Sequence, residues 1–204
     1  MAGILKVGGV PLATHSDSTA KVSLDTNVEL PASQGSSLSL ISTQTFSSVT
    51  SVSFQNCFSS TYNHYKLLMQ ADCTAHFWLQ FFTTGTTAHT SNDYSSAIAG
   101  ADDDGTDSRF AHKSSVAAWN LNNDSSGKNY VDMTIYNPNV ATETYFNGLT
   151  TMKRSAGKFI ANFMGGAVDI STSFTGFRVF ANYYNTLVPA LNLSGVISIY
   201  GTKQ

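Results

Sequence analysis

Alternation of apolar and polar residues with a period of two dominates the chain from Leu38 onward. The clearest run is Tyr130-Val131-Asp132-Met133-Thr134-Ile135-Tyr136, in which Val131, Met133 and Ile135 share one face. Successive side chains of a strand point to opposite faces of a sheet, so such a run has one buried and one solvated face. We expect strands near residues 38–43, 45–54, 64–72, 75–83, 94–100, 114–121, 129–137, 143–152, 158–166, 175–184 and 193–202.

Several of these runs predict which side chains face the core. The inward sets are Phe159, Ala161 and Phe163; Phe177, Val179 and Ala181; and Tyr65, Leu67, Met69 and Ala71. In the closing run, Val196 and Tyr200 share one face and Ile197 and Ile199 the other, so we expect that strand to be buried on both faces. Gly165-Gly166 lies within a strand and indicates a bulge or bend.

Turn-forming clusters separate the expected strands. They are Thr83-Thr84-Gly85-Thr86, Asp102-Asp103-Asp104-Gly105, Asn122 to Gly127, Asn137-Pro138-Asn139 and Ala156-Gly157. Residues 56–64 have room for one short helical turn. About ten short strands with this punctuation predict an all-β fold, an antiparallel two-sheet sandwich of the jelly-roll kind with an extended N-terminal arm.

Residues 1–36 differ from the rest of the chain. They contain no aromatic residue, and their apolar residues come in short pieces separated by Gly8-Gly9, Pro11 and Pro31. Such a segment cannot bury a core of its own, so it must lie on this domain, on a sister copy or on a partner. We therefore divide the chain into an extended docking arm, 1–36, and a sandwich domain, 37–204. The residues expected to dock are Ile4, Leu5, Val7, Val10 and Leu12.

Charge and hydropathy narrow the partners. The 204 residues include 11 Lys+Arg and 13 Asp+Glu, a net charge of −2, and charged residues make up 12 %, about half the usual share of a soluble domain. This balance argues against a nucleic-acid partner held by phosphate contacts, and it suits a chain packed against copies of itself or a partner. The first residues lack the apolar run of a signal peptide, and no run reaches a membrane span. We expect a soluble product without a membrane partner that stays in the compartment where it is made.

The two cysteines, Cys57 and Cys73, fall on different expected elements. Two buried free thiols are the favoured interpretation, and a disulfide between them stays open.

Metal and cofactor signals are weak. The Asp102–Asp107 loop offers alternating carboxylates and a glycine, as Ca²⁺ sites do, but it lacks EF-hand spacing and a following bidentate Glu. A solvated acidic loop is favoured, with Ca²⁺ binding left open. The histidines His15, His64, His76, His89 and His112 have no metal-site spacing, although His64 and His76 flank one expected hairpin. We predict no metal site and no cofactor.

Catalytic signals are equally sparse, and we predict that the chain is not an enzyme. No Gly-x-Ser-x-Gly elbow occurs, and the best acids for a glycan-degrading enzyme, the least favoured alternative, are Glu143 and Asp132. A second alternative is a carbohydrate-binding module whose platform is formed by aromatic residues. Its members would be Trp78, Trp119, Tyr94, Tyr183 and Tyr184, for which a core or interface role is favoured.

Through several short motifs the chain resembles a group of small tailed-phage virion proteins, many of them from marine and cyanobacterial phages. The motifs are Met1 to Val7, Leu40 to Thr45, Val52-Ser53-Phe54, Phe58 to Lys66, Thr175 to Phe180 and Gly195 to Lys203. The family usually has Asp after Lys-Val, where this chain has Gly8.

The resemblance implies a non-enzymatic structural protein of the virion surface, with a β-sandwich head and an N-terminal docking arm. Its role would be capsid decoration (a cement protein) or head fibre, the alternative being a tail fibre or a receptor- or carbohydrate-binding module for host attachment. The implied partners are the major capsid protein or tail and portal components, sister copies in a homo-oligomer, expected to be a trimer, and in the alternative role a host surface glycan. The protein would be found in the virion, assembled in the host cytoplasm.

Overall fold

The computed structural model describes residues 3–7, 10–15, 22–24, 38–73, 75–102, 108–121, 127–153, 157, 159–182, 189 and 191–202. Their regular structure consists of strands, and all the strand pairs are antiparallel. The chain divides into two compact units, Met1–Ser36 and Ser37–Gln204. The predicted fold class, all-β with an antiparallel two-sheet sandwich, is confirmed.

The N-terminal unit contains a three-stranded sheet in the order β1-β2-β3. Its strands are β1 (Gly3–Val7), β2 (Val10–His15) and β3 (Val22–Leu24). The register places Leu5 opposite Ala13 and Ala13 opposite Leu24, a row of apolar residues across the sheet. The five residues expected to dock lie in β1 and β2, and their docking role stays a prediction.

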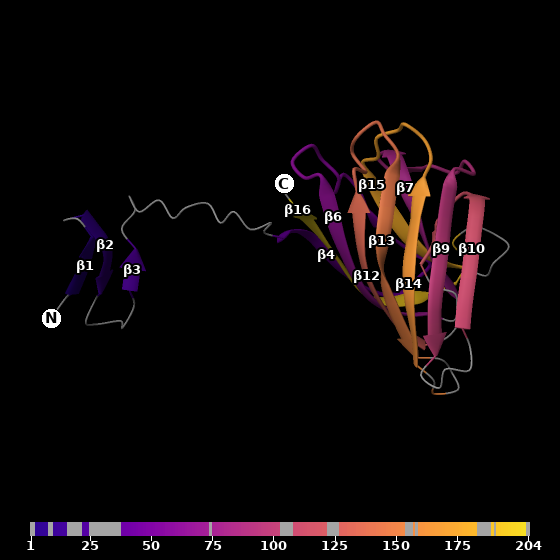
Figure 1. The fold of residues 1–204 in the computed structure, drawn as a ribbon, viewed down its shortest axis with the longest axis horizontal. Helices are drawn as coiled ribbons and strands as arrows, with labels where there is room; N and C mark the ends of the chain where they lie inside the picture. Colours follow the sequence, from indigo (N-terminus) through magenta and orange to yellow (C-terminus); the bar gives the residue numbers. More distant parts are fainter. Residues whose placement is uncertain are drawn as a thin grey trace. The chain divides into compact units, whose positions relative to one another are not determined.

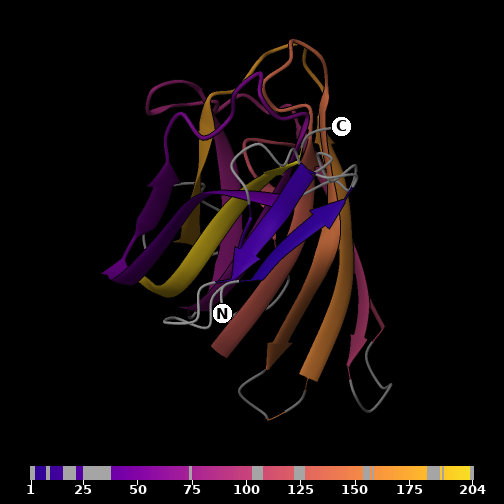
Figure 2. The ribbon, with the colours of Figure 1, turned by 90° about the vertical axis from the view of Figure 1, so that its left-hand side faces the viewer.

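The larger sheet of the sandwich has eight strands in the order β10-β9-β14-β13-β12-β6-β16-β4. Its strands are β4 (Leu38–Val49), β6 (His64–Cys73), β9 (Tyr94–Asp102), β10 (Ser108–Val116), β12 (Gly127–Tyr136), β13 (Thr144–Lys153), β14 (Phe159–Val168) and β16 (Leu193–Thr202). The strands lie side by side in Figure 1, and Figure 2 shows the curvature at the β4–β16 end, where β16 is yellow.

The smaller sheet has five strands. The order is β11-β7-β15-β5, with β8 paired to β7. Its strands are β5 (Ser51–Phe54), β7 (His76–Thr84), β8 (Thr87–Ala88), β11 (Trp119–Asn120) and β15 (Gly176–Asn182). β7 and β15 lie behind the larger sheet in the view of Figure 1.

Aromatic rings fill the space between the two sheets. Phe81 of the smaller sheet stacks on Phe174 with centroids 4.7 Å apart and meets Trp119 edge-on at 4.7 Å. The ring centroid of Trp119 in turn lies 4.2 Å from that of Phe146, which belongs to the larger sheet. The predicted inward sets on β6, β12 and β15 are buried, which confirms those assignments.

The chain crosses between the sheets where a hairpin was expected. The strands β6 and β7 belong to different sheets, so the expected hairpin over residues 64–83 is wrong. His64 pairs with Tyr136 and Thr202 in the larger sheet, whereas His76 pairs with Asn182 in the smaller one. Two consecutive strands with inward apolar faces can pair as a hairpin or face each other across a core, and alternation alone does not distinguish these arrangements.

The face assignment of β14 is also wrong. Phe159 and Phe163 are 53 % and 72 % exposed, and Ala161 is exposed with them, while Ile160, Asn162 and Met164 are buried. The run Phe-Ile-Ala-Asn-Phe-Met has apolar residues in both phases, and a shift of one residue exchanges the faces of a strand. The pairing with β13 decides the phase, because it sets Ile160 beside the buried Met152.

Two further expectations need correction. In β16 Ile197 and Ile199 are buried but Val196 and Tyr200 only partly, so that strand is fully buried on one face alone. The β13–β14 register runs unbroken past Gly165-Gly166, so no bulge occurs there. A Cβ at Gly166 would overlap the Ser95 carbonyl oxygen and lie 2.6 Å from Phe146 Cε1, which shows that close packing requires this glycine.

Strand boundaries shift where the composition is ambiguous. The expected strand 45–54 is divided between β4 and β5, with the chain bending at Thr50 after Ser48 adopts a φ of 53°. The expected strand 114–121 is replaced by β10, which starts at Ser108, and the short β11. Residues 56–63 form turns and irregular segments and no helix, and His64 begins β6.

Candidate functional site

The outer face of the eight-stranded sheet carries large side chains that the core does not use. The exposed apolar and aromatic residues on β6, β12, β13 and β14 are Leu68, Tyr130, Tyr145, Leu149, Phe159 and Phe163. The register sets Leu68, Asp132, Leu149 and Phe163 in one row across four strands. Because clustered apolar side chains are uncommon on the surface of a monomer, this face is the candidate functional surface of the sandwich.

Two adjoining hollows lie on this face. The first, of about 400 Å³, is lined by Leu68, Met69, Gln70, Tyr130, Val131, Asp132, Leu149, Thr151, Val196 and Ser198. The second, of about 370 Å³, is lined by Lys66, Asp132, Thr134, Asn147, Gly148, Leu149, Phe163 and Met164. Asp132 and Leu149 line both hollows, so together they form one depression, which we call the sheet groove.

A third and smaller hollow continues the sheet groove at its other end. It measures about 180 Å³ and shares Tyr130 and Thr151 with the first hollow. Lys128, Lys153 and Phe159 also line it, and the Lys153 ammonium lies 5.6 Å from the centroid of the Phe159 ring. That ring is therefore already covered in part by a cation.

The charge of the sheet groove is balanced within the groove itself. Asp132 forms an ion pair with Lys66, and both side chains are partly open to solvent. Charged residues lining the first two hollows are confined to this pair. The rest of the polar lining consists of hydroxyl and amide groups, those of Gln70, Thr134, Asn147, Thr151 and Ser198. The groove thus combines apolar surface with uncharged hydrogen-bonding groups.

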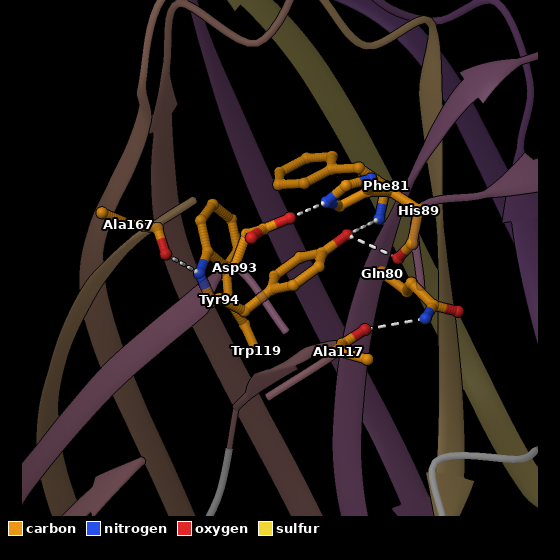
Figure 3. Close-up of polar contacts among 8 residues, drawn as sticks. All are labelled: Gln80, Phe81, His89, Asp93, Tyr94, Ala117, Trp119 and Ala167. Carbon is orange, nitrogen blue, oxygen red and sulfur yellow. Dashed lines mark hydrogen bonds and ion pairs between the residues drawn. The ribbon is translucent and has the colours of Figure 1, made fainter. Parts of the chain in front are cut away.

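A second polar cluster lies at the β7–β9 end of the core (Figure 3). The Tyr94 hydroxyl accepts a hydrogen bond from the Phe81 N–H at 3.0 Å and donates to the His89 carbonyl oxygen at 3.2 Å. His89 Nε2 lies 2.9 Å from Asp93 Oδ2. Burial raises the pKa of the Tyr94 phenol, so this hydroxyl stays protonated and serves as a structural link between the sheets.

Replacing Tyr94 by Phe tests this link. The Phe81 N–H would lose its partner while buried, and we expect the free energy of unfolding to fall by about 1–3 kcal/mol. Equilibrium unfolding in urea measures the change. A Tyr94→Phe variant as stable as the parent would contradict the structural role of the hydroxyl.

Both cysteines are free and buried, which agrees with the favoured interpretation. The Cys57 Sγ donates to the Phe54 carbonyl oxygen and the Cys73 Sγ to the Ala75 carbonyl oxygen. Burial raises the pKa of the Cys57 thiol to about 12 and that of the Cys73 thiol to about 11. Both groups are therefore inert at neutral pH, because the thiolate is the reactive form.

Thiol labelling gives the corresponding prediction. At pH 8 the two thiols of the folded protein should react with an aromatic disulfide reagent far more slowly than those of the urea-unfolded chain, which should release two equivalents of the aromatic thiol.

The raised pKa values also make stability depend on pH. Because the folded pKa values of both thiols lie above the ordinary value of 9.0, the stabilisation from the two protonated thiols is present below pH 9 and is lost as the pH rises toward 11 and 12. For the labelling experiment, rapid reaction of the folded protein at pH 8 would contradict the burial of the thiols, because it would show that they are accessible.

Three members of the alternative aromatic platform are not on the surface. Trp78, Trp119 and Tyr94 are all fully buried, so the core interpretation is confirmed for them and the sugar-binding one is wrong. Tyr183 and Tyr184 lie outside the described residues. The exposed aromatics of the described strands, which the sequence did not indicate as a surface, are Tyr130, Tyr145, Phe159 and Phe163. The alternation that buries Val131 already places Tyr130 outward.

The acids considered for catalysis do not meet. Asp132 lies in the middle of β12, whereas Glu143 precedes β13 and lies beyond the Tyr136–Tyr145 pair. The offset corresponds to about six residues, or roughly 20 Å along the strands, against the 5 to 10 Å of a glycosidase pair. These two residues therefore do not form such a site.

The remaining ligand predictions are tested in part. Asp102 ends β9, and residues 103–107 of the acidic loop lie outside the described residues. Among the residues that the structure describes, no group of three or more His, Cys, Asp and Glu side chains could hold a metal ion. Within the same ranges, no helix is long and apolar enough to span a membrane.

Comparisons of the chain with protein-family models, with curated proteins and with solved structures find no match. The functional assignment therefore depends on the two units and on the sheet groove.

Proposed function

We propose that this chain is a non-enzymatic structural protein of a phage virion surface, where the N-terminal unit docks on the particle and the sandwich is displayed. The observation that carries the proposal is the division into a small unit, Met1–Ser36, and a separate sandwich, Ser37–Gln204. A capsid decoration or head fibre needs these two functions, attachment and display.

The size of the N-terminal sheet supports a docking role. β1, β2 and β3 have 5, 6 and 3 residues. A sheet of this size is stable when it has a hydrophobic face and something to pack against. Leu5, Val7 and Val10 are apolar residues of β1 and β2 that a docking surface could use. β1 and β3 are the outer strands of this sheet, a position that suits the addition of a partner strand.

The sandwich supports a display role. Eight of its strands follow the orders β4-β16-β6-β12 and β5-β15-β7-β11, and along these eight the chain changes sheet at every step except from β7 to β11. We assign this arrangement to the jelly roll. The insertions β9, β10, β13 and β14 widen the larger sheet, and β8 is added to the smaller one. The charged share of 12 % keeps electrostatic repulsion between neighbouring copies small, which favours dense arrays and homo-oligomers such as the expected trimer.

Quantitative mass spectrometry of purified particles tests the proposal. We expect peptides of this chain in particles whose genome encodes it, retained after density-gradient purification. A copy number close to that of the major capsid protein indicates decoration, and a low one indicates a tail or vertex fibre. Absence from purified particles, with the chain present in the infected cell, would contradict a structural role.

A further inference from the structure

We propose that the sheet groove on the outer face of β6, β12, β13 and β14 binds an uncharged polysaccharide chain. This inference goes beyond the virion role, since it depends on the sandwich alone. It places a binding activity on residues other than the buried tryptophans.

Two exposed rings provide the apolar contacts. Tyr130 is 48 % exposed and lines the first hollow, and Phe163 is 72 % exposed and lines the second. β13 separates their strands, so their backbones are on the order of 10 Å apart across the sheet. An exposed ring offers a flat apolar surface that can cover the C–H face of a pyranose.

Polar side chains lie close to Tyr130 on its own strand and on the two neighbouring strands of the same face. Asp132 is flanked in register by Leu68 and Leu149, and Tyr130 by Gln70 and Thr151. Carboxylate and amide oxygens accept hydrogen bonds from sugar hydroxyls, whereas amide N–H groups and hydroxyls also donate to them. Apolar surface alternating with such groups matches a ligand that has both C–H faces and hydroxyls.

The balanced charge selects among ligands. Because Lys66 already neutralises Asp132, the first two hollows offer no net charge to a phosphate or a carboxylate. The lysines of the third hollow lie at one end, beyond Tyr130. Neighbouring hollows share lining residues, Asp132 and Leu149 for the first two and Tyr130 and Thr151 for the first and third. A row of adjoining hollows suits an internal stretch of a neutral chain better than a single sugar.

Affinity electrophoresis of the full-length protein in gels containing dextran, glucomannan, agarose or xyloglucan tests the proposal. We expect retardation by at least one of these neutral polysaccharides. Tyr130→Ala and Phe163→Ala should each weaken it roughly tenfold, as for a central contact residue, while Tyr130→Phe should retain it. The matched control is Tyr145→Ala, because Tyr145 is 49 % exposed on the same face but lines none of the three hollows.

Four results would overturn the inference. The first is unchanged mobility in all four gels, and the second is equal retardation of the parent and Tyr130→Ala. The third is retardation only in a fifth gel that contains the anionic polysaccharide alginate, which would assign binding to Lys128 and Lys153 of the third hollow. Sedimentation is run in parallel: self-association of the parent that Phe163→Ala abolishes, without retardation in any gel, would assign the groove to a second copy. Particle incorporation is a separate readout, so the virion proposal can fail while this inference stands.

Discussion

A chain that lacks residues 1–36 should fold normally and be excluded from virions. The contacts that build the sandwich core lie within Ser37–Gln204, so its unfolding transition should be close to that of the parent. Attachment is expected to be lost because β1, β2 and β3 belong to the unit that we propose docks on the particle. Co-expression of tagged full-length and truncated chains during infection, followed by particle purification, measures incorporation directly.

The matched control for this truncation is a full-length chain altered on the sandwich. Phe163→Ala removes an exposed ring from the other unit and should incorporate like the parent. A truncated chain that is folded and still enters particles at the parental level would show that docking does not depend on residues 1–36. A truncated chain that fails to fold would contradict the independence of the sandwich.

Trp119→Ala should lower the free energy of unfolding by about 3–5 kcal/mol, the largest effect that we expect from a single substitution. Its ring is fully buried between Phe81 and Phe146, and its Nε1–H donates to the Ala167 carbonyl oxygen at 3.0 Å (Figure 3). The side chain thus links β11 of the smaller sheet to β13 and β14 of the larger sheet. For a domain of this size the melting temperature should fall by roughly 10 °C.

An exposed ring provides the comparison for Trp119. Phe163→Ala also removes an aromatic side chain, but from a position 72 % exposed, and should change stability by less than about 0.5 kcal/mol. Urea unfolding of both variants measures the difference. If the free energy of unfolding falls equally in the two variants, or falls more for Phe163→Ala than for Trp119→Ala, the faces of the sandwich are assigned incorrectly.

Sequence predicts the strands of this fold well where apolar residues keep to one phase. In β12, Val131, Met133 and Ile135 alternate with polar residues, and all three are buried as predicted. In β14 both phases contain apolar residues, and the pairing of Ile160 with Met152 decides which face is buried. The inward face of β14 is therefore a tertiary property that a single strand does not encode.

The candidate site shows the same limit. That Tyr130 faces outward follows from its own strand, but its position beside Asp132, Leu149 and Phe163 in a groove depends on the order β6-β12-β13-β14. The sequence instead directs attention to Trp78 and Trp119, because tryptophan is a common sugar-stacking residue. Both lie in the core, where large aromatic rings contribute the most buried area.

Photo-crosslinking in assembled particles tests the docking orientation most directly. A benzoyl-phenylalanine at position 5, in β1, should form adducts with another virion protein, whereas the same group in place of Phe163 should form none with the capsid or tail. Adducts are identified by mass spectrometry of purified particles. Adducts to a capsid or tail protein from position 163 with none from position 5 would contradict the account, because the sandwich would then be the attached unit.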